Sequence, residues 1–280
     1  MPAPNLSDSY SFNEKMLFLK NTPKDEINVI GLGSSMALNN LHSKSIAGKY
    51  NSYLNVGSWG LSMKDDFYLL KIIQNIYHPK IIILSSNIVD FQQVDKKINF
   101  SELNSYINSN KIGNIYYSIK NFNLKYYVSN FKYAKIVRND KNAYSYLGFD
   151  KFGGVNFVPH GFQISNERWQ TESVNKKVKQ NEYDYLDSVA DYCTKKGIKL
   201  MFFESPYRSG LSSNFDEKRK KNLLRHTKQI KDVLDKNKQI FINANKLIWS
   251  DSLFVDAIHF NEFGAQKFTD FCLKQVELNK

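Results

Sequence analysis

Residues 27–35 read INVIGLGSS, a short apolar, β-branched run that ends in a turn of two glycines and two serines. Helical spacing of apolar residues follows from Met36 to Ile46. A strand, a tight glycine turn and a helix in this order are the building unit of sheets with helices on both faces. The stretch therefore predicts an α/β fold.

The same alternation recurs along the chain. Further strands are predicted at the apolar runs 53–56, 80–84, 198–203 and 239–242, and further helices at about 62–77, 174–196, 215–237 and 264–277. The run 80–84, KIIIL, is apolar over four successive residues, which is typical of a strand buried on both faces of a parallel sheet. We therefore predict a three-layer α/β/α sandwich around a mostly parallel sheet of about five strands.

Two segments fall outside this alternation. Residues 1–22 are polar and contain Pro2 and Pro4, so we expect a leader that joins the fold late, ahead of a single α/β domain at 23–280. Within that domain, residues 96–172 have no clean period, and 106–146 hold eight of the 17 tyrosines with seven Lys/Arg against one acid. We interpret residues 96–172 as a Tyr/Lys-rich insertion or lid.

Composition limits the class of protein. Of 280 residues, 42% are hydrophobic and 24% charged, which excludes collagen-like, disulfide-scaffold and wholly disordered chains. The net charge of +12 predicts an anionic partner. Cys193 and Cys272 lack the spacing of a zinc site or a disulfide framework, so we expect both to be buried and reduced, and we predict no metal site.

Targeting signals are not evident. No apolar run approaches the roughly 18 to 20 residues that span a bilayer, and the run Met16 to Leu19 is too short for a signal-peptide core. The chain as given is expected to be soluble and cytoplasmic. A periplasmic or cell-surface location stays open if an export signal or anchor lies outside this sequence.

Candidate functional groups follow the predicted strands, where open α/β sheets bind their ligands. They are Ser34-Ser35 after the first strand, Gly57-Ser58-Trp59-Gly60 after the second, Ser85-Ser86-Asn87 after the third, and Asp256-Ala257-Ile258-His259 before the last helix. A serine at the start of a helix lies at the positive end of the helix dipole, which stabilises an oxyanion. Each motif alone is weak evidence, and their conjunction favours catalysis.

This order of motifs resembles the four sequence blocks of the SGNH (GDSL-like) hydrolase superfamily, which is named for its Ser, Gly, Asn and His. The resemblance covers about 25–90 and 197–275 and implies a flavodoxin-like sandwich. It implies that Ser35 is the nucleophile, His259 the general base and Asp256 its orienting acid. The implied oxyanion hole consists of the Ser35 N–H, Gly60 and Asn87.

The chain departs from the commonest SGNH pattern at two positions, with Ser34 and Ile88 in places where many members have aspartate. Gly-Ser-Ser variants resemble the branch that contains bacterial O-acetylation and teichoic-acid alanylation proteins. The resemblance therefore implies an O-acetyltransferase or O-acetylesterase that acts on a bacterial surface polysaccharide or another glycan. No cofactor is implied, although a transferase would need an acetyl donor such as acetyl-CoA as co-substrate.

Several alternatives stay open from the sequence. Ser34 is the nucleophile if the register is shifted by one residue, although a capping role is the simpler interpretation. Trp59, Trp169 and Arg208 are candidate substrate-binding residues at the active edge, and His42, His78 and His226 are expected to be surface residues of helical stretches.

Two further function classes compete with the enzyme. The Tyr- and Lys-rich segments permit a nucleic-acid-binding protein, although the bases form no recognised module and no nucleic acid is expected as partner. A non-catalytic glycan-binding protein is the other alternative, which an intact Ser, Asn, Asp and His set disfavours. We interpret the basic insertion as part of the recognition of an anionic glycan, and the sequence makes no prediction of the oligomeric state.

Overall fold

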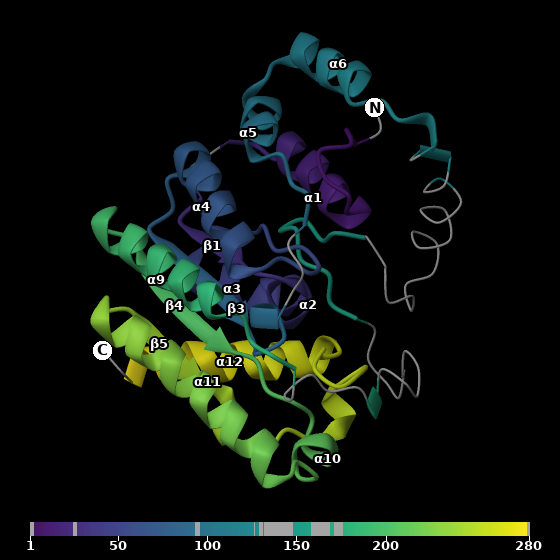
Figure 1. Ribbon diagram of the computed structural model, residues 1–280. Coiled ribbons are helices and arrows are strands. Elements are labelled where there is room, and N and C mark those ends of the chain that lie inside the picture. Colours follow the sequence, from purple (N-terminus) through teal and green to yellow (C-terminus); the bar gives the residue numbers. More distant parts are fainter. Residues whose placement is uncertain are drawn as a thin grey trace.

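The computed structural model describes residues 3–24, 27–92, 96–125, 127–128, 131, 148–157, 169–170 and 176–278. Its centre is a parallel sheet with the strand order β2-β1-β3-β4-β5 (Figure 1). The strands are β1 (Val29–Leu32), β2 (Tyr53–Asn55), β3 (Ile81–Ser86), β4 (Lys199–Glu204) and β5 (Ile240–Asn243). The predicted sandwich of about five parallel strands is confirmed, and the order 2-1-3-4-5 is the flavodoxin-like one.

Helices cover both faces of the sheet (Figure 1). One face carries α4 (Met63–Tyr77), α9 (Gln180–Lys195) and α11 (Glu217–Lys236), and the other carries α2 (Ser35–Asn40), α3 (Ser43–Tyr50) and α12 (Glu262–Leu278). Successive strand residues alternate between the two cores, as Phe202 and Phe203 of β4 do. Both faces of each central strand are therefore buried, which explains why β3 is apolar without alternation.

Among the described residues, four short helices follow strands at the carboxyl edge of the sheet. They are η1 (Asp90–Gln92), α10 (Ser209–Ser212), η2 (Ala244–Lys246) and η3 (Asp251–Leu253).

The segment after β1 forms two helices, where the apolar spacing predicted one helix from Met36 to Ile46. Leu41 has extended dihedral angles, φ −85° and ψ 122°, and ends α2. The imidazole Nδ1 of His42 then accepts a hydrogen bond from the Ser45 N–H at 3.3 Å and caps α3. The prediction of a single helix is wrong because apolar spacing does not reveal a side-chain cap inside the run.

Much of the predicted N-terminal leader is a helix, α1 (Tyr10–Asn21). Its Phe12, Met16 and Leu19 have no exposed surface and pack into the core beside α4. Lys15 is buried as well, and its ammonium donates to the carbonyl oxygens of Asn55 (3.3 Å) and Gly153. Burial lowers the pKa of Lys15 to about 7. This segment is therefore part of the core and not a peripheral leader.

The described parts of the predicted insertion at 96–172 are joined to the domain at both ends. Its first part forms α5 (Phe100–Asn108) and α6 (Lys111–Lys120), and α5 buries Leu103, Tyr106 and Ile107 against the core. Its return segment, 148–157, lies along α2, where the Val155 N–H donates to the Leu38 carbonyl at 2.9 Å. We interpret the basic insertion as part of glycan recognition, and two of its lysines, Lys132 and Lys135, lie outside the described residues.

Candidate active site

The two serines after β1 have different positions at the start of α2. Ser34 is fully buried and is the N-cap, with its Oγ accepting from the Met36 N–H at 3.2 Å. Ser35 is the first helical residue and is partly exposed. The turn requires glycine at position 33, because φ is +130° there and a Cβ atom would lie 2.5 Å from the Ser85 carbonyl oxygen. Ser34 therefore shapes the turn, and Ser35 faces the open edge.

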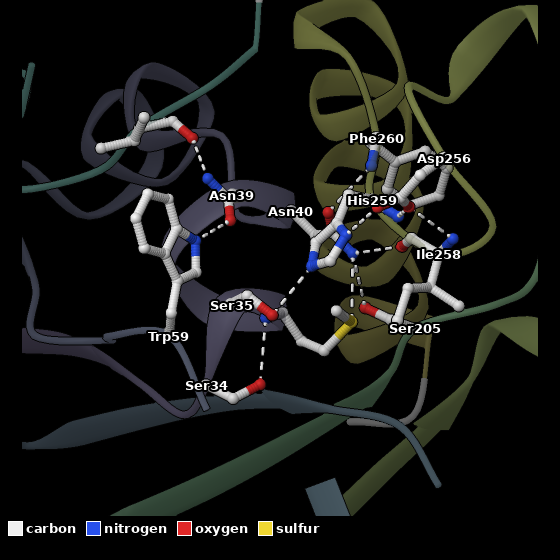
Figure 2. A network of polar contacts seen from close by, with 12 residues as sticks. Ser34, Ser35, Asn39, Asn40, Trp59, Ser205, Asp256, Ile258, His259 and Phe260 are labelled. Atoms are coloured by element: carbon white, nitrogen blue, oxygen red, sulfur yellow. Dashed lines mark hydrogen bonds and ion pairs between the residues drawn. The ribbon is translucent and has the colours of Figure 1, made fainter. Parts of the chain in front are cut away.

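Ser35, His259 and Asp256 form one hydrogen-bonded row (Figure 2). The Ser35 Oγ lies 2.8 Å from His259 Nε2, and His259 Nδ1 lies 2.7 Å from Asp256 Oδ2. A carboxylate only accepts hydrogen bonds, so the imidazole proton lies on Nδ1 and Nε2 is left to accept the Ser35 hydroxyl. The structure thus brings together the three residues that the sequence resemblance selected.

Asp256 is held as an anion inside the protein. It is 3% exposed, and burial by itself would raise its pKa. Electrostatic attraction to the His259 ring, the hydrogen bond from that ring and two backbone N–H groups outweigh burial and hold the pKa of Asp256 below its usual value. The two N–H groups are those of Ile258 and His259, at 2.9 and 2.7 Å. The carboxylate therefore stays charged to orient His259 and to stabilise its protonated form.

Asn40 connects the helix of Ser35 to the loop of His259 (Figure 2). It is the last residue of α2 and is fully buried. Its amide nitrogen donates to the Ile258 carbonyl at 3.0 Å, and its amide oxygen accepts from the Phe260 N–H at 3.0 Å. Asn40 therefore holds both chain neighbours of His259. Because Ser35 is the first residue of α2 and Asn40 the last, this short helix positions the serine and the histidine relative to each other.

We expect Asn40→Leu to lower the turnover number for a small ester by about 10- to 100-fold with little change in KM, because a shift of about 1 Å between reacting groups has effects of this size. Steady-state kinetics of the folded variant measures both constants. In a His259→Ala background the same substitution should have no further effect on turnover. Additive losses in the two backgrounds would contradict a role through His259.

Three N–H donors at this edge have no hydrogen-bond partner among the described residues: the Ser35 N–H, the Gly60 N–H and the Asn87 Nδ2 amide. Gly60 has a φ of +69°, which favours glycine, and its loop is held to β1 by the Ser58 N–H donating to the Gly33 carbonyl at 3.1 Å. A buried amide donor without a partner is uncommon in proteins, and such donors are typical of sites that receive an oxyanion.

Asn87 is oriented by its own turn. Its Oδ1 accepts from the Val89 N–H at 2.9 Å, so its Nδ2 is the part of the side chain left to act as a donor. Asp90 holds the backbone of this turn, because its Oδ2 accepts from the Ser86 hydroxyl at 2.8 Å and from the Asn87 N–H at 3.3 Å. The buried side chain of Asn87 is therefore fixed with its donor end unused.

Asp90 is a site residue that the sequence analysis missed. Burial raises its pKa to about 6, against hydrogen bonds from Ser34, Ser86 and the Asn87 backbone that lower it. Through Ser34 and Asn87 this carboxylate joins the turn after β1 to the turn after β3. The signal in the sequence is the spacing Asn87-x-x-Asp90, which is typical of an acid that closes a turn on its own backbone.

Trp59 lies beside Ser35, on the side away from His259 (Figure 2). Its indole N–H donates to the Asn39 Oδ1 at 2.8 Å, and the Asn39 amide donates to the Val155 carbonyl at 2.8 Å. The partly exposed indole is thus held against the return segment of the insertion. It stays a candidate for substrate contact.

Arg208 and Trp169 lie together, and most of the guanidinium donors of Arg208 are bonded within the protein. It is 3% exposed, and its guanidinium pairs with Asp251 at 2.7 Å and donates to the Trp169 carbonyl at 2.8 and 3.1 Å. The guanidinium carbon also lies 4.2 Å from the centre of the Trp169 ring. These contacts make Arg208 a residue that holds the Trp169 segment on the domain, and its contact with substrate stays a prediction.

Among the described residues, the other histidines and both cysteines lie outside this row. His42, at 7% exposed, is buried and not on the surface as expected. His226 is buried, contrary to the expectation of a surface position, and its Nδ1 lies 2.8 Å from the Tyr183 hydroxyl; burial lowers its pKa to about 3. Cys193 and Cys272 are buried and unpaired, as predicted.

Searches for a metal site and for a membrane span were negative for the described residues. No group of three or more His, Cys, Asp or Glu there is arranged to hold a metal ion. None of the helices in these residues has the length and apolar content to cross a bilayer.

Comparison with known proteins finds similarity in structure only. No family model and no curated protein sequence matches the chain. An acetyl xylan esterase aligns with a TM-score of 0.47 and 12% identity over 89% of this chain and 100% of that chain. A lipase/acylhydrolase from Enterococcus faecalis aligns at 0.45 and 10% over 90% and 96%. A carbohydrate acetylesterase from Sinorhizobium meliloti aligns at 0.41 and 11% over 90% and 100%.

Proposed function

We propose that the protein is a serine-dependent acyl-ester enzyme with Ser35 as nucleophile, His259 as general base and Asp256 as the acid that orients it. The observation that carries this proposal is the hydrogen-bonded row from Ser35 to Asp256, at the sheet edge that also holds three unused N–H donors. Such a row activates a hydroxyl that is a weak nucleophile by itself.

The proposed reaction has two steps. His259 Nε2 takes the Ser35 proton while Oγ bonds to the acyl carbon, and the oxyanion accepts hydrogen bonds from the Ser35 N–H, the Gly60 N–H and Asn87 Nδ2. The bond to the leaving alkoxide then breaks, and His259 returns the proton to it. In the second step water or a sugar hydroxyl gives its proton to His259 Nε2 and bonds to the acyl carbon. The bond from that carbon to Ser35 Oγ then breaks, and His259 returns the proton to Oγ.

The proposed substrate is an O-acetyl ester of a bacterial surface polysaccharide or another glycan, and the enzyme is an O-acetylesterase or an O-acetyltransferase. The support for this substrate class is the resemblance of the Gly33-Ser34-Ser35 turn to the polysaccharide O-acetylation branch of the SGNH superfamily. The exposed indole of Trp59 next to Ser35 offers a surface on which a sugar ring can stack.

We expect the purified protein to hydrolyse p-nitrophenyl acetate and to be labelled at Ser35 by a fluorophosphonate, which bonds covalently to an activated serine. Peptide mass spectrometry locates the label. A chain that binds glycans without catalysis, or a nucleic-acid-binding protein, would give neither result.

A second experiment with isotopically labelled acetyl donors determines whether water or a sugar hydroxyl accepts the acetyl group. Acetyl-CoA or p-nitrophenyl acetate is incubated with candidate glycans, and mass spectrometry measures whether acetyl is found on sugar or as free acetate. Acetyl on sugar supports the transferase, and free acetate alone supports the esterase.

A further inference from the structure

Helix α6 and the residues after it expose an unusual number of large apolar side chains. Ile112, Ile115 and Ile119 lie on one side of the helix and are 77%, 49% and 71% exposed. Four large apolar side chains that follow the helix in the chain, Phe122, Leu124, Val128 and Phe131, are exposed as well. We call these seven side chains the α6 face. Monomeric proteins rarely leave many large apolar side chains of one short segment in water, and exposed apolar patches mark interaction sites.

The opposite side of α6 attaches the helix to the domain. Tyr117 packs against the core, and its ring meets that of Tyr106 edge to face at a centroid distance of 6.0 Å. The Lys120 ammonium pairs with Glu102 of α5. These contacts orient the three isoleucines away from α5, and α6 lies beyond α5 at the rim of the molecule (Figure 1).

The chemistry of the stretch discriminates between partners. Residues 111–131 contain three lysines and no acidic residue. Lys120 is paired with Glu102, so Lys111 and Lys125 carry the excess positive charge that favours an anionic partner. Aliphatic side chains make no specific contact with a sugar hydroxyl or a phosphate, and they gain free energy only by leaving water. Apolar side chains, flanking lysines and several tyrosines are the composition of segments that lie at the surface of an anionic bilayer.

A second copy of the chain fits this face less well. In a symmetric dimer the same patch meets itself, so the lysines around the α6 face would approach the lysines of the other copy. An anionic lipid surface instead complements both the charge and the apolar side chains.

We infer that the α6 face docks the protein on the surface of an anionic lipid membrane. The apolar side chains enter the region between the headgroups and the acyl chains, while the lysines remain at the headgroups. This inference goes beyond the proposed acyl-ester function and does not depend on it. Its consequence is that the enzyme works close to a membrane without a spanning helix in the described residues.

The test is sedimentation of the purified protein with vesicles of phosphatidylcholine and phosphatidylglycerol at a 3:1 ratio, with pure phosphatidylcholine vesicles for comparison. We expect binding to the anionic vesicles that weakens at high salt, and at least fivefold weaker binding for Ile112→Ser/Ile115→Ser/Ile119→Ser. The matched control is Leu224→Ser/Leu247→Ser/Ile248→Ser, which removes three exposed apolar side chains elsewhere and should bind as the original protein does.

Three results would overturn the inference. One is equal vesicle binding by the α6 variant and the original protein. Another is no binding to anionic vesicles together with a dimer, seen by analytical ultracentrifugation, that the α6 variant loses. The third is a lower thermal unfolding midpoint in the α6 variant than in the control, which would mean that the chain itself covers this face. Hydrolysis of p-nitrophenyl acetate in solution, measured in parallel, reports on the proposed function alone.

Discussion

Ser35→Ala is expected to lower the turnover of p-nitrophenyl acetate by about 10⁴- to 10⁶-fold, the range found when an activated serine or its base is removed from a triad. The hydroxyl of Ser35 donates to His259 Nε2 across 2.8 Å, so it is the hydroxyl that the imidazole can deprotonate. Steady-state assays of the folded variant, together with loss of fluorophosphonate labelling, measure the effect.

Two further variants sharpen this prediction. His259→Ala should lose a similar factor, and the double variant should be no slower than either single variant because the two residues act as a unit. Ser34→Ala tests the alternative register: as a cap, Ser34 should affect stability by about 1 kcal/mol and turnover far less than Ser35 does. Turnover retained in Ser35→Ala and lost in Ser34→Ala would move the nucleophile by one residue.

The sequence predicts the sheet well because its signals are local. The buried run KIIIL of β3 and the glycine turn after β1 each depend on neighbouring residues, and both lie where they were expected. The helices were less predictable. The break at His42 depends on one side-chain cap, and α1 is polar by composition but buries Phe12, Met16 and Leu19. Whether a mixed stretch is buried depends on tertiary contacts, which its composition does not show.

Some residues of the candidate site could also be predicted from local sequence, and others could not. Ser35, Asp256 and His259 stand in short motifs that the resemblance identifies, so their positions could be predicted. Asn40 and Asp90 act through contacts to residues that are known only after folding, such as the bonds from Asn40 to the neighbours of His259 some 220 positions away. The sequence also does not show that Arg208 is bonded to Asp251 and Trp169, because these partners lie 43 and 39 positions away in the chain.

The structure also changes which partner we infer for the basic segment of the chain. The bases after residue 106 suggested recognition of an anionic glycan, but the side chains exposed beside them on α6 are aliphatic. A patch that is both basic and aliphatic fits an anionic bilayer better than a sugar polymer, since only the bilayer removes the aliphatic groups from water. Within the proposed function, glycan contact then rests on groups near Ser35, and Figure 2 shows Trp59 beside it.

Asn87→Ala is expected to lower the turnover number by about 10²- to 10³-fold with little change in KM, the effect of removing one oxyanion donor. The reason is that Asn87 Nδ2 is buried and unused in the resting protein, so its hydrogen bond forms when the oxyanion does. Steady-state kinetics with p-nitrophenyl acetate measures both constants, and thermal unfolding checks that the variant folds.

Asn87→Asp is the matched variant that separates the donor from the turn. The aspartate keeps an oxygen where Oδ1 accepts the Val89 N–H, so the turn after β3 retains its hydrogen bond. The substitution replaces the amide donor by a carboxylate. A carboxylate only accepts hydrogen bonds, and its negative charge repels an oxyanion. We therefore expect Asn87→Asp to be at least as slow as Asn87→Ala, with an unfolding midpoint closer to that of the original protein. If Asn87→Asp instead kept near-normal turnover while Asn87→Ala lost it, Asn87 would support the turn and the oxyanion would have to be held by the Ser35 and Gly60 N–H groups alone.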